Sequence, residues 1–574
     1  MKKILNDLSW KVAGRAGDGI LNAGLIMFAK TCVRKGLHVF ATAEYPSLIR
    51  GGHNHLDVRV RDDDVYAHTK HIDILVALNN ESVTKHQDKV TEGGAIIYDG
   101  KTIQLDDLKK NVNYYDIPLE KIAEKSGGKI MKNTVAIGAT FALLDSDLKE
   151  LNKVIKDTFA RKGEKVVDGN INAAKAGFDY LRENFGNEFK MKLENGKAES
   201  IFLSGHEAVA IGALKGGCKF FAGYPMTPAT SVMHNLAKFE KTHNFVVKHT
   251  EDELAAINMA IGANYAGVRS MTATSGGGFC LMSEGLGLAI VTETPLVAVE
   301  SQRPGPGTGM ATHSGQGDLR FMLHASTDEG PRIVIAPKDV DDCFFRTIDA
   351  FNIAEKYQTP VIILTDKFLG ESYITTSEFD TKKVKIDRGE FAKNPKEGEF
   401  NRYQITESGV SPRSVPSQEG GMHVASSYEH DEHGFEREEE DNRIAMHDKR
   451  FRKFENMKKE LPPPKLEGSK DADVTIIAWG STYGCVKEAE RLLSKDGIKS
   501  NHLHIVFASP LHDKEIAEVI KSAKNVVIVE NNKTGQLAGI IREQTGLEIK
   551  NKILKYDGRA FFPEEIYEKI KGIV

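Results

Sequence analysis

Short β-branched runs alternate with segments of helical period along most of the chain. Residues 1–190 contain LSWKVAG, LHVFATA, IDILVALN and GAIIYD, and residues 197–375 contain KFFAGYP, GVRSMTATS and TPLVAVES. The rhythm returns in residues 471–574 with VTIIAWGS and NVVIVENN. Because βαβ units place parallel strands beneath covering helices, we predict an α/β protein built from several doubly wound, mostly parallel sheet domains.

Residues 376–470 do not follow this rhythm. The stretch is polar and charged, and the acidic FEREEED and the proline-rich LPPPK lie near its end. Such a composition favours a long connection that wraps a surface, with one helix near residues 443–459. We therefore expect three domains, at 1–190, 197–375 and 471–574, with a connecting segment at 376–470.

Composition narrows the functional classes. Lys+Arg 77 against Asp+Glu 81 leaves a formal net charge of −4, so no basic surplus favours nucleic acid. The cysteines are scattered and form no C-x-x-C pair, which argues against a disulfide framework, a zinc ribbon or iron–sulfur ligation by this chain alone. The first ten residues lack the apolar core of a signal peptide, and no apolar run is long enough for a membrane span, so we expect a cytoplasmic protein.

The loop Gly223-Tyr224-Pro225-Met226-Thr227-Pro228 follows a predicted strand, and its two prolines stiffen it. One reading is structural: Thr227 caps a helix whose first residue is Pro228. The alternative is a preorganised hydroxyl at the carboxyl end of a strand, where open α/β sheets bind ligands.

A carboxylate at the next strand-to-helix junction also has two readings. Thr250 and Glu253 have the T-x-x-E spacing of a capping box, which would be a purely structural role. The alternative is that Glu253 serves chemistry, because small residues follow it as far as Gly262 and permit tight packing.

Three glycine-rich stretches remain. Thr274-Ser275-Gly276-Gly277-Gly278 joins a strand to a helix, and a bare turn explains it. Residues 301–313 form a Gly/Pro loop in which Arg303 suits fork-like recognition of a carboxylate, although a solvated surface arginine is the plainer reading. Residues 14–19, GRAGDG, predict either an anion-binding turn or a tight turn that needs glycine, and lack the spacing of a dinucleotide fingerprint.

Taken in order, these stretches resemble the α subunit of the 2-oxoacid:ferredoxin (acceptor) oxidoreductases, in the form with a fused N-terminal γ domain, of which the 2-oxoglutarate type is the first candidate. GRAGDG and EYPSLIRGGHN carry the likeness in the γ-like part. GYPMTP, EDELAAINMAIGANYAG, MTATSGGG and QRPGPGTGMATHSGQGD carry it in a thiamine pyrimidine-binding-type domain. ITESGVSPRSVP, YEHDEHG, VENNKTGQL and YDGRAFFPEE extend it through the connecting segment and a transketolase C-terminal-like domain.

The resemblance implies a thiamine diphosphate enzyme that works only with a β subunit. That partner is expected to carry Mg and a [4Fe-4S] cluster, with thiamine diphosphate shared between the chains in a dimer of αβ heterodimers. The implied reaction is oxidative decarboxylation of a 2-oxoacid, 2-oxoglutarate first, with CoA and ferredoxin, or the reverse. This chain has no C-x-x-C pair and no Asn at the spacing that a GDG…N diphosphate motif requires, which agrees with such a division.

The same resemblance assigns the cofactor-binding residues. It aligns Glu253, with Glu251 as the neighbour that could be confused with it, to the glutamate that hydrogen-bonds the N1′ of the pyrimidine. Tyr224, Pro225 and Thr227 are expected to contact the cofactor.

Substrate roles follow in the same way. Thr227, Arg303 and Thr312 are expected at the 2-oxoacid, with Glu253, Thr227 and Arg303 as the catalytic set and no metal ligand. His313 and Lys215 are guesses for a distal carboxylate.

Some alternatives stay open. The loops around Arg15 and Arg50 could place CoA or hold the assembly together. Pyruvate or a branched or aromatic 2-oxoacid could be the substrate, and a non-oxidative thiamine decarboxylase or a non-catalytic scaffold for a redox partner would also fit parts of the sequence.

Overall fold

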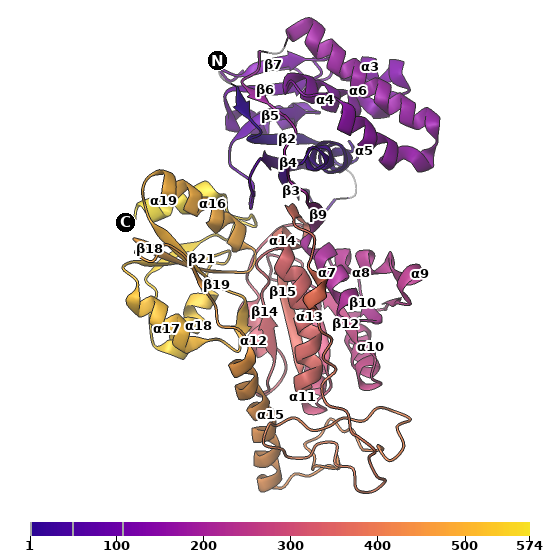
Figure 1. Cartoon of the computed structure of the whole chain (residues 1–574), viewed down its shortest axis with the longest axis vertical. Helices are drawn as coiled ribbons and strands as arrows, with labels where there is room; N and C mark the ends of the chain where they lie inside the picture. The colour runs from indigo at the N-terminus through magenta and orange to yellow at the C-terminus, as the bar shows by residue number, and fades with distance from the viewer. Residues whose placement is uncertain (1–2, 49–50, 106–107, 187) are drawn as a thin grey trace. The chain divides into compact units, whose positions relative to one another are not determined.

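The computed structural model describes residues 3–48, 51–105, 108–186 and 188–574. The chain divides into two compact units (Figure 1). Unit 1 comprises residues 1–203, 372–378 and 562–565, and unit 2 comprises the remainder. Both units combine parallel-rich sheets with helices, so the predicted α/β class is confirmed.

Unit 1 contains an eight-stranded sheet in the order β7-β6-β5-β2-β4-β3-β16-β9. Its strands are β2 (Leu8–Arg15), β3 (His38–Glu44), β4 (His53–Arg61), β5 (Ile72–Ala77), β6 (Val90–Tyr98), β7 (Asn113–Asp116), β9 (Ile201–Ser204) and β16 (Tyr373–Thr376). Strands β2, β5, β6 and β7 pair in parallel. The half formed by β4, β3 and β16 is antiparallel, a detail that the βαβ rhythm did not reveal, because β3 returns directly into β4.

The helices of unit 1 lie beside this sheet (Figure 1) and form a large and a smaller hydrophobic core with it. They are η1 (Asn22–Ala29), α1 (Lys30–Arg34), α2 (Asn80–His86), α3 (Leu119–Ser126), α4 (Lys132–Leu143), α5 (Lys149–Phe159) and α6 (Glu164–Phe185). Trp10 on β2 stacks on Phe28 of η1 with ring centroids 4.4 Å apart, and Phe141 of α4 follows. A separate pair, β1 (Ile4–Leu5) and β8 (Met191–Lys192), runs parallel.

Unit 2 contains a seven-stranded sheet in the order β11-β10-β12-β13-β15-β14-β20. Its strands are β10 (Phe220–Gly223), β11 (Val246–His249), β12 (Ser270–Thr274), β13 (Leu296–Gln302), β14 (Ile333–Ile335), β15 (Pro360–Asp366) and β20 (Phe507–Ser509). All neighbours pair in parallel except β14 and β20. The helices are α7 (Gly205–Lys215), α8 (Thr230–Ala237), α9 (Glu240–His243), α10 (Glu253–Tyr265), α11 (Gly276–Val291), α12 (Leu319–His324), α13 (Val340–Tyr357) and α14 (Lys367–Glu371).

A second, five-stranded sheet of unit 2 has the order β17-β19-β18-β21-β22. It comprises β17 (Leu466–Gly468), β18 (Val474–Trp479), β19 (Ser500–Ile505), β21 (Val526–Glu530) and β22 (Asn551–Leu554), with helices α16 (Thr482–Lys495), α17 (Asp513–Ser522), α18 (Gln536–Thr545) and α19 (Pro563–Lys571). Residues 376–470 contain long stretches without helix or strand, and the helix predicted near 443–459 is present as α15 (Glu440–Glu460).

In the described ranges, none of the helices combines the length and the apolar character that crossing a membrane requires.

Candidate functional site

Four neighbouring strands of unit 2 deliver the predicted site residues to one edge of the seven-stranded sheet. Strands β11, β10, β12 and β13 are parallel neighbours, so their carboxyl ends lie at the same edge. The Tyr224–Pro228 loop follows β10, Glu253 follows β11, Gly276–Gly278 follow β12 and Arg303 follows β13. The carboxyl edge of an open parallel sheet is the usual place for a ligand.

The Tyr224–Pro228 loop does not cap α8. This helix begins at Thr230, and its N-cap residue, Ala229, makes no side-chain cap bond. The reading in which Thr227 caps a helix starting at Pro228 is therefore wrong, because the chain continues for two more residues before the helix begins. Instead, the Thr227 carbonyl accepts a hydrogen bond of 2.7 Å from Arg303 Nη1. The Thr227 side chain is half-buried and is not committed to a cap.

Asp252 caps α10, and the capping box predicted from Thr250 and Glu253 is also wrong. The Asp252 side chain accepts a hydrogen bond of 2.8 Å from the backbone N–H of Ala255. Thr250 Oγ1 donates to the Asp252 carbonyl at 2.8 Å instead of accepting from a backbone N–H of the helix terminus. A neighbouring acid thus takes the structural task that spacing had suggested for Glu253.

Glu253 has a buried carboxyl group with one unsatisfied oxygen. The residue is 3% exposed, and its Oε1 has no hydrogen-bond partner among the residues that the structure describes. Burial raises the pKa of this carboxyl above its usual value, and the nearby Asp252 raises it further. A buried polar atom without a partner is costly, so it marks a place where a ligand is expected to complete the contact.

The glycine at position 278 makes room for this carboxyl. A Cβ built on Gly278 would overlap Glu253 Oε1 and the Thr274 hydroxyl. A turn that merely needed flexibility would not explain this requirement, since α11 already begins at Gly276. Gly278 therefore serves the close approach of Glu253 to the first turn of α11.

Arg303 and Thr312 are both buried, at 9% and 6% exposure. Arg303 Nε has no hydrogen-bond partner in the described part of the chain, so this guanidinium retains an unused donor. Thr312 Oγ1 lies 3.3 Å from His313 Nδ1. Lys215, in contrast, ends α7 at the edge where β10 begins, which is opposite to the edge that carries Glu253.

Comparison with known proteins agrees with this geometry. The family model described as "Pyruvate flavodoxin/ferredoxin oxidoreductase, thiamine diP-bdg" matches residues 211–449, "Pyruvate ferredoxin/flavodoxin oxidoreductase" matches 9–180, and "Transketolase, C-terminal domain" matches 466–558. The 2-oxoacid:ferredoxin oxidoreductase 2 α subunit of Aeropyrum pernix is 31% identical over 99% of this chain and 98% of its own. The 2-oxoglutarate oxidoreductase subunit KorA of Mycobacterium tuberculosis is 30% identical over 99% of this chain and 92% of its own.

A solved structure extends the match to three dimensions. The 2-oxoglutarate:ferredoxin oxidoreductase from Magnetococcus marinus, with 2-oxoglutarate, coenzyme A and succinyl-CoA bound, has a TM-score of 0.93 at 34% identity, and the match covers 99% of both chains. This chain belongs to the 2-oxoacid:ferredoxin oxidoreductase α-subunit family. The predicted resemblance is thereby confirmed, including the thiamine diphosphate-binding domain and the transketolase C-terminal domain.

The γ-like part of this family member was expected to offer loops around Arg15 and Arg50. Arg50 lies outside the described residues. In the GRAGDG turn, Asp18 Oδ2 accepts a hydrogen bond of 2.8 Å from the Arg15 backbone N–H, and Lys132 lies 3.4 Å from the same carboxylate. The turn's own acid therefore occupies a donor that an anionic ligand would need, which favours the tight-turn reading.

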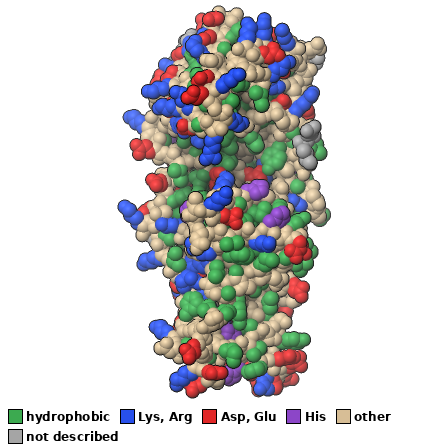
Figure 2. All heavy atoms as spheres, turned by 90° about the vertical axis from the view of Figure 1, so that its right-hand side faces the viewer, with side chains coloured by type: hydrophobic (Ala, Val, Ile, Leu, Met, Phe, Trp, Pro, Cys, Tyr) green, Lys and Arg blue, Asp and Glu red, His purple; other side chains and the backbone are tan. Residues whose placement is uncertain are grey.

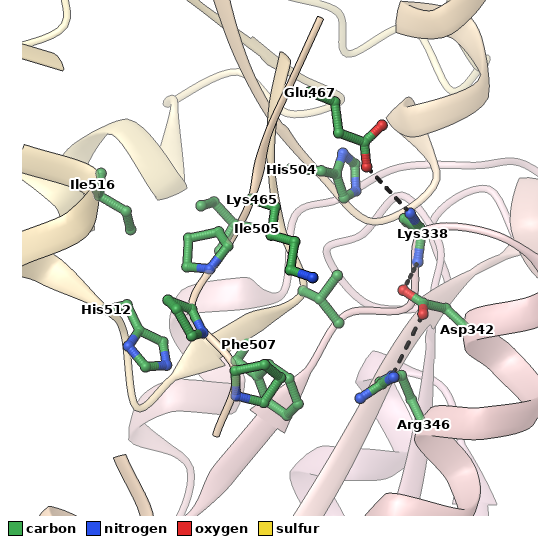
Figure 3. A pocket seen from close by; sticks show the side chains of 14 residues that line it. Lys338, Asp342, Arg346, Lys465, Glu467, His504, Ile505, Phe507, His512 and Ile516 are labelled. Carbon is green, nitrogen blue, oxygen red and sulfur yellow. Dashed lines mark hydrogen bonds and ion pairs between the residues drawn. The ribbon is translucent and has the colours of Figure 1, made fainter. Parts of the chain in front are cut away.

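A cavity of about 250 Å³ lies elsewhere in unit 2 and shares no residue with the Glu253 site (Figure 3). Lys338 on its wall lies 3.8 Å from Glu467, and Arg346 pairs with Asp342 at 3.4 Å. These two cations are matched by carboxylates of the same cavity, and we assign the cavity no ligand.

Sequence reasoning missed Asp252 and Gly278 of this α subunit. Asp252 stands between the two residues of the suspected capping box, so local spacing pointed past it. Gly278 was visible only as part of a turn.

Proposed function

We propose that this chain is the α subunit of a thiamine-diphosphate-dependent 2-oxoglutarate:ferredoxin oxidoreductase. The reaction is the oxidative decarboxylation of the 2-oxoacid with CoA to acyl-CoA, CO2 and reduced ferredoxin, or its reverse. The observation that carries the proposal is the buried Glu253 carboxyl, whose Oε1 no described residue satisfies and which Asp252 releases from capping.

The residues at this edge fit the aminopyrimidine half of the cofactor. Glu253 would hold the ring nitrogen N1′, and a carboxyl group with a raised pKa is suited to keep and return a proton at that atom. Gly278 leaves the space that a side chain would fill, and Tyr224, Pro225 and Thr227 would flank the ring. When bound, the cofactor supplies the carbanion chemistry that 2-oxoacid decarboxylation requires.

Arg303 and Thr312 would bind the substrate. The buried guanidinium retains an unused donor at Nε and can pair with the 2-oxoacid carboxylate, since charge-assisted bonds to arginine are strong and directional. The Thr312 hydroxyl would donate to the carbonyl oxygen.

We infer that a separate β subunit completes the site. It would carry Mg and a [4Fe-4S] cluster, since this sequence contains neither a C-x-x-C pair nor the GDG…N motif, and would pass electrons to ferredoxin. Exposed apolar side chains lie near the candidate site and would suit such a partner, namely Tyr224, Leu254 and Leu281. Figure 2 shows hydrophobic side chains gathered on this side of unit 2. We further propose a dimer of αβ heterodimers.

The choice of 2-oxoglutarate is supported by the names of the Mycobacterium tuberculosis relative and the Magnetococcus marinus structure. A dicarboxylate needs a polar contact for its distal end, and His313, adjacent to Thr312, is the candidate on the same loop as Arg303. Pyruvate and branched or aromatic 2-oxoacids are the competing substrates, and a substrate panel distinguishes them.

The test uses the complex purified with its β subunit. We expect reduction of ferredoxin or a viologen that depends on both 2-oxoglutarate and CoA. Glu253→Gln should lower kcat by about 10²- to 10⁴-fold with the assembly intact, because positioned acid–base groups contribute on that order. Glu251→Gln is the matched control, since Glu251 is exposed and two residues away, and it should keep wild-type kcat.

Two results would contradict the proposal. The first is Glu253→Gln turning over at the wild-type rate per folded complex. The second is an equal loss in the Glu251→Gln control, which would place the effect on the helix terminus rather than on the buried carboxyl.

A further inference from the structure

Three acids near the carboxyl ends of β13 and β15 have no role in the function proposed above. Asp366 ends β15 and is satisfied, because it accepts hydrogen bonds from the Leu369 backbone N–H at 2.9 Å and from the Ser481 hydroxyl. Glu300 on β13 differs. It is 0% exposed, and no donor in the described part of the chain reaches either of its carboxyl oxygens.

The side chain that meets Glu300 is another acid. The Asp318 carboxyl interacts directly with the Glu300 carboxyl. The Asp318 backbone N–H donates to Gln302 Oε1 at 3.1 Å, which holds Asp318 beside the end of β13. Two ionised carboxylates offer only acceptors, so such a contact forms a hydrogen bond only when one of them carries a proton. An isolated buried carboxylate is also strongly disfavoured.

The surroundings decide which acid keeps the proton. Asp318 is only partly buried, and its Oδ2 lies against Gly276, the first residue of the 16-residue helix α11, where the helix dipole favours a negative charge. Burial raises the pKa of Asp318 to about 6, whereas burial and the two neighbouring acids raise the pKa of Glu300 well above its usual value. The charged groups acting on Glu300 are Asp318, Asp366 and Arg303.

We propose that Glu300 keeps a proton at neutral pH and donates it in a hydrogen bond to ionised Asp318, and that the net charge of this acid pair governs how Arg303 binds the 2-oxoacid. The effect on 2-oxoacid binding rests on the proposed function, whereas the proton on Glu300 does not. With one proton the pair carries a single negative charge, which balances the Arg303 guanidinium. A second negative charge would repel the carboxylate of an incoming 2-oxoacid, since like charges at short range in a buried site interact strongly.

The first experiment detects the proton directly. Infrared spectra of the wild-type complex at pH 7 should contain a C=O absorption of a protonated carboxyl that is missing in Glu300→Gln. Glu355→Gln is the matched control, because Glu355 is equally buried but paired with arginines, and its replacement should remove no such absorption. An unchanged absorption in Glu300→Gln would overturn the proposal.

If Glu300→Gln does not fold, Asp318→Asn provides the second measurement. It keeps Glu300 but removes the ionised acceptor, so the same absorption should shift in frequency. An absorption that is absent from the wild type, or unmoved in Asp318→Asn, would show that Glu300 does not donate to Asp318.

Kinetic measurements test the effect of the acid pair on 2-oxoacid binding. Wild-type KM for the 2-oxoacid should rise at alkaline pH as Glu300 loses its proton, whereas KM for CoA should not. Glu300→Ala should raise KM for the 2-oxoacid by about tenfold, equivalent to about 1.4 kcal/mol, and Glu300→Gln should recover most of that loss and abolish the alkaline rise. A Glu300→Gln complex with the wild-type pH profile would refute this effect. A complex inactive with every 2-oxoacid would refute the proposed function instead, and leave the infrared result standing.

Discussion

Two groups of buried glutamates in unit 2 have opposite environments. Glu355 on α13 is held by Arg269 at 2.6 Å, by Arg388 at 2.7 Å and by Arg413. Glu253 and Glu300, at the carboxyl edge of the sheet, are buried to a similar degree but have oxygens that no described donor reaches. Burial alone therefore does not distinguish the two groups, whereas the supply of hydrogen-bond donors does.

The ion-paired acids also show how the connecting segment is held. Arg388 and Arg413 belong to residues 376–470 and reach the buried Glu355. Lys449 and Lys453 of α15 both contact the fully buried Glu293, and although burial opposes it, these lysines hold the pKa of Glu293 below its usual value. The predicted surface connection is thus anchored by buried ion pairs.

The largest expected effect comes from removing the charge of Glu355, which pairs with three arginines. Glu355→Gln should lower the free energy of unfolding by about 3–5 kcal/mol, because it leaves buried arginines without their counter-charge. Urea titration measures this loss. Glu390→Gln, at an exposed position in the connecting segment that supplies Arg388 and Arg413, is the control and should stay within about 0.5 kcal/mol of the wild type. Equal stability of the two variants would contradict the distinction between the two groups of acids.

A smaller effect is expected from a side chain that crowds the Glu253 carboxyl. Gly278→Ala should cost about 1–3 kcal/mol in stability, since its methyl group would overlap Glu253 Oε1 and Thr274 Oγ1. It should also lower kcat by displacing the carboxyl. Gly277→Ala is the matched control: a Cβ there meets only the Gly307 carbonyl at 3.8 Å, so it should be neutral or slightly stabilising. Comparable kcat losses in both variants would contradict a specific contact with Glu253.

The smallest effect is a difference in pH dependence. The folded-state pKa of Glu253 is raised above its usual 4.5, so its proton favours the folded state at low pH and that contribution is lost as pH rises from 4.5 through the folded pKa. Glu253→Gln should therefore match the wild type near pH 4 and exceed it in unfolding free energy at pH 7, by about 1.4 kcal/mol for every tenfold rise in the proton affinity of the carboxyl on folding. Denaturant titrations at the two pH values measure the difference, and a difference of the opposite sign would contradict the desolvated carboxyl.

The sequence predicts which residues are candidates for the site, but not which residues cap the neighbouring helices. Glu253, Thr227 and Arg303 were identified as candidates because they follow strands that are read easily from β-branched runs. The capping roles were assigned wrongly at Thr227 and Thr250, because a helix start depends on backbone geometry that shifts by one or two residues without changing the pattern. The roles of the site residues in catalysis stay predictions.

The amino-acid sequence by itself determined the α/β class, the order of strands and helices and the family, because each depends on periodicity and motifs within short stretches of chain. Only the tertiary structure decided which acids are left without donors. Glu300 and Asp318 are separated by a glycine- and proline-rich loop, and Gly278 reaches Glu253 from another strand's helix. Desolvation and hydrogen-bond supply come from segments distant in the chain, and no local pattern encodes them.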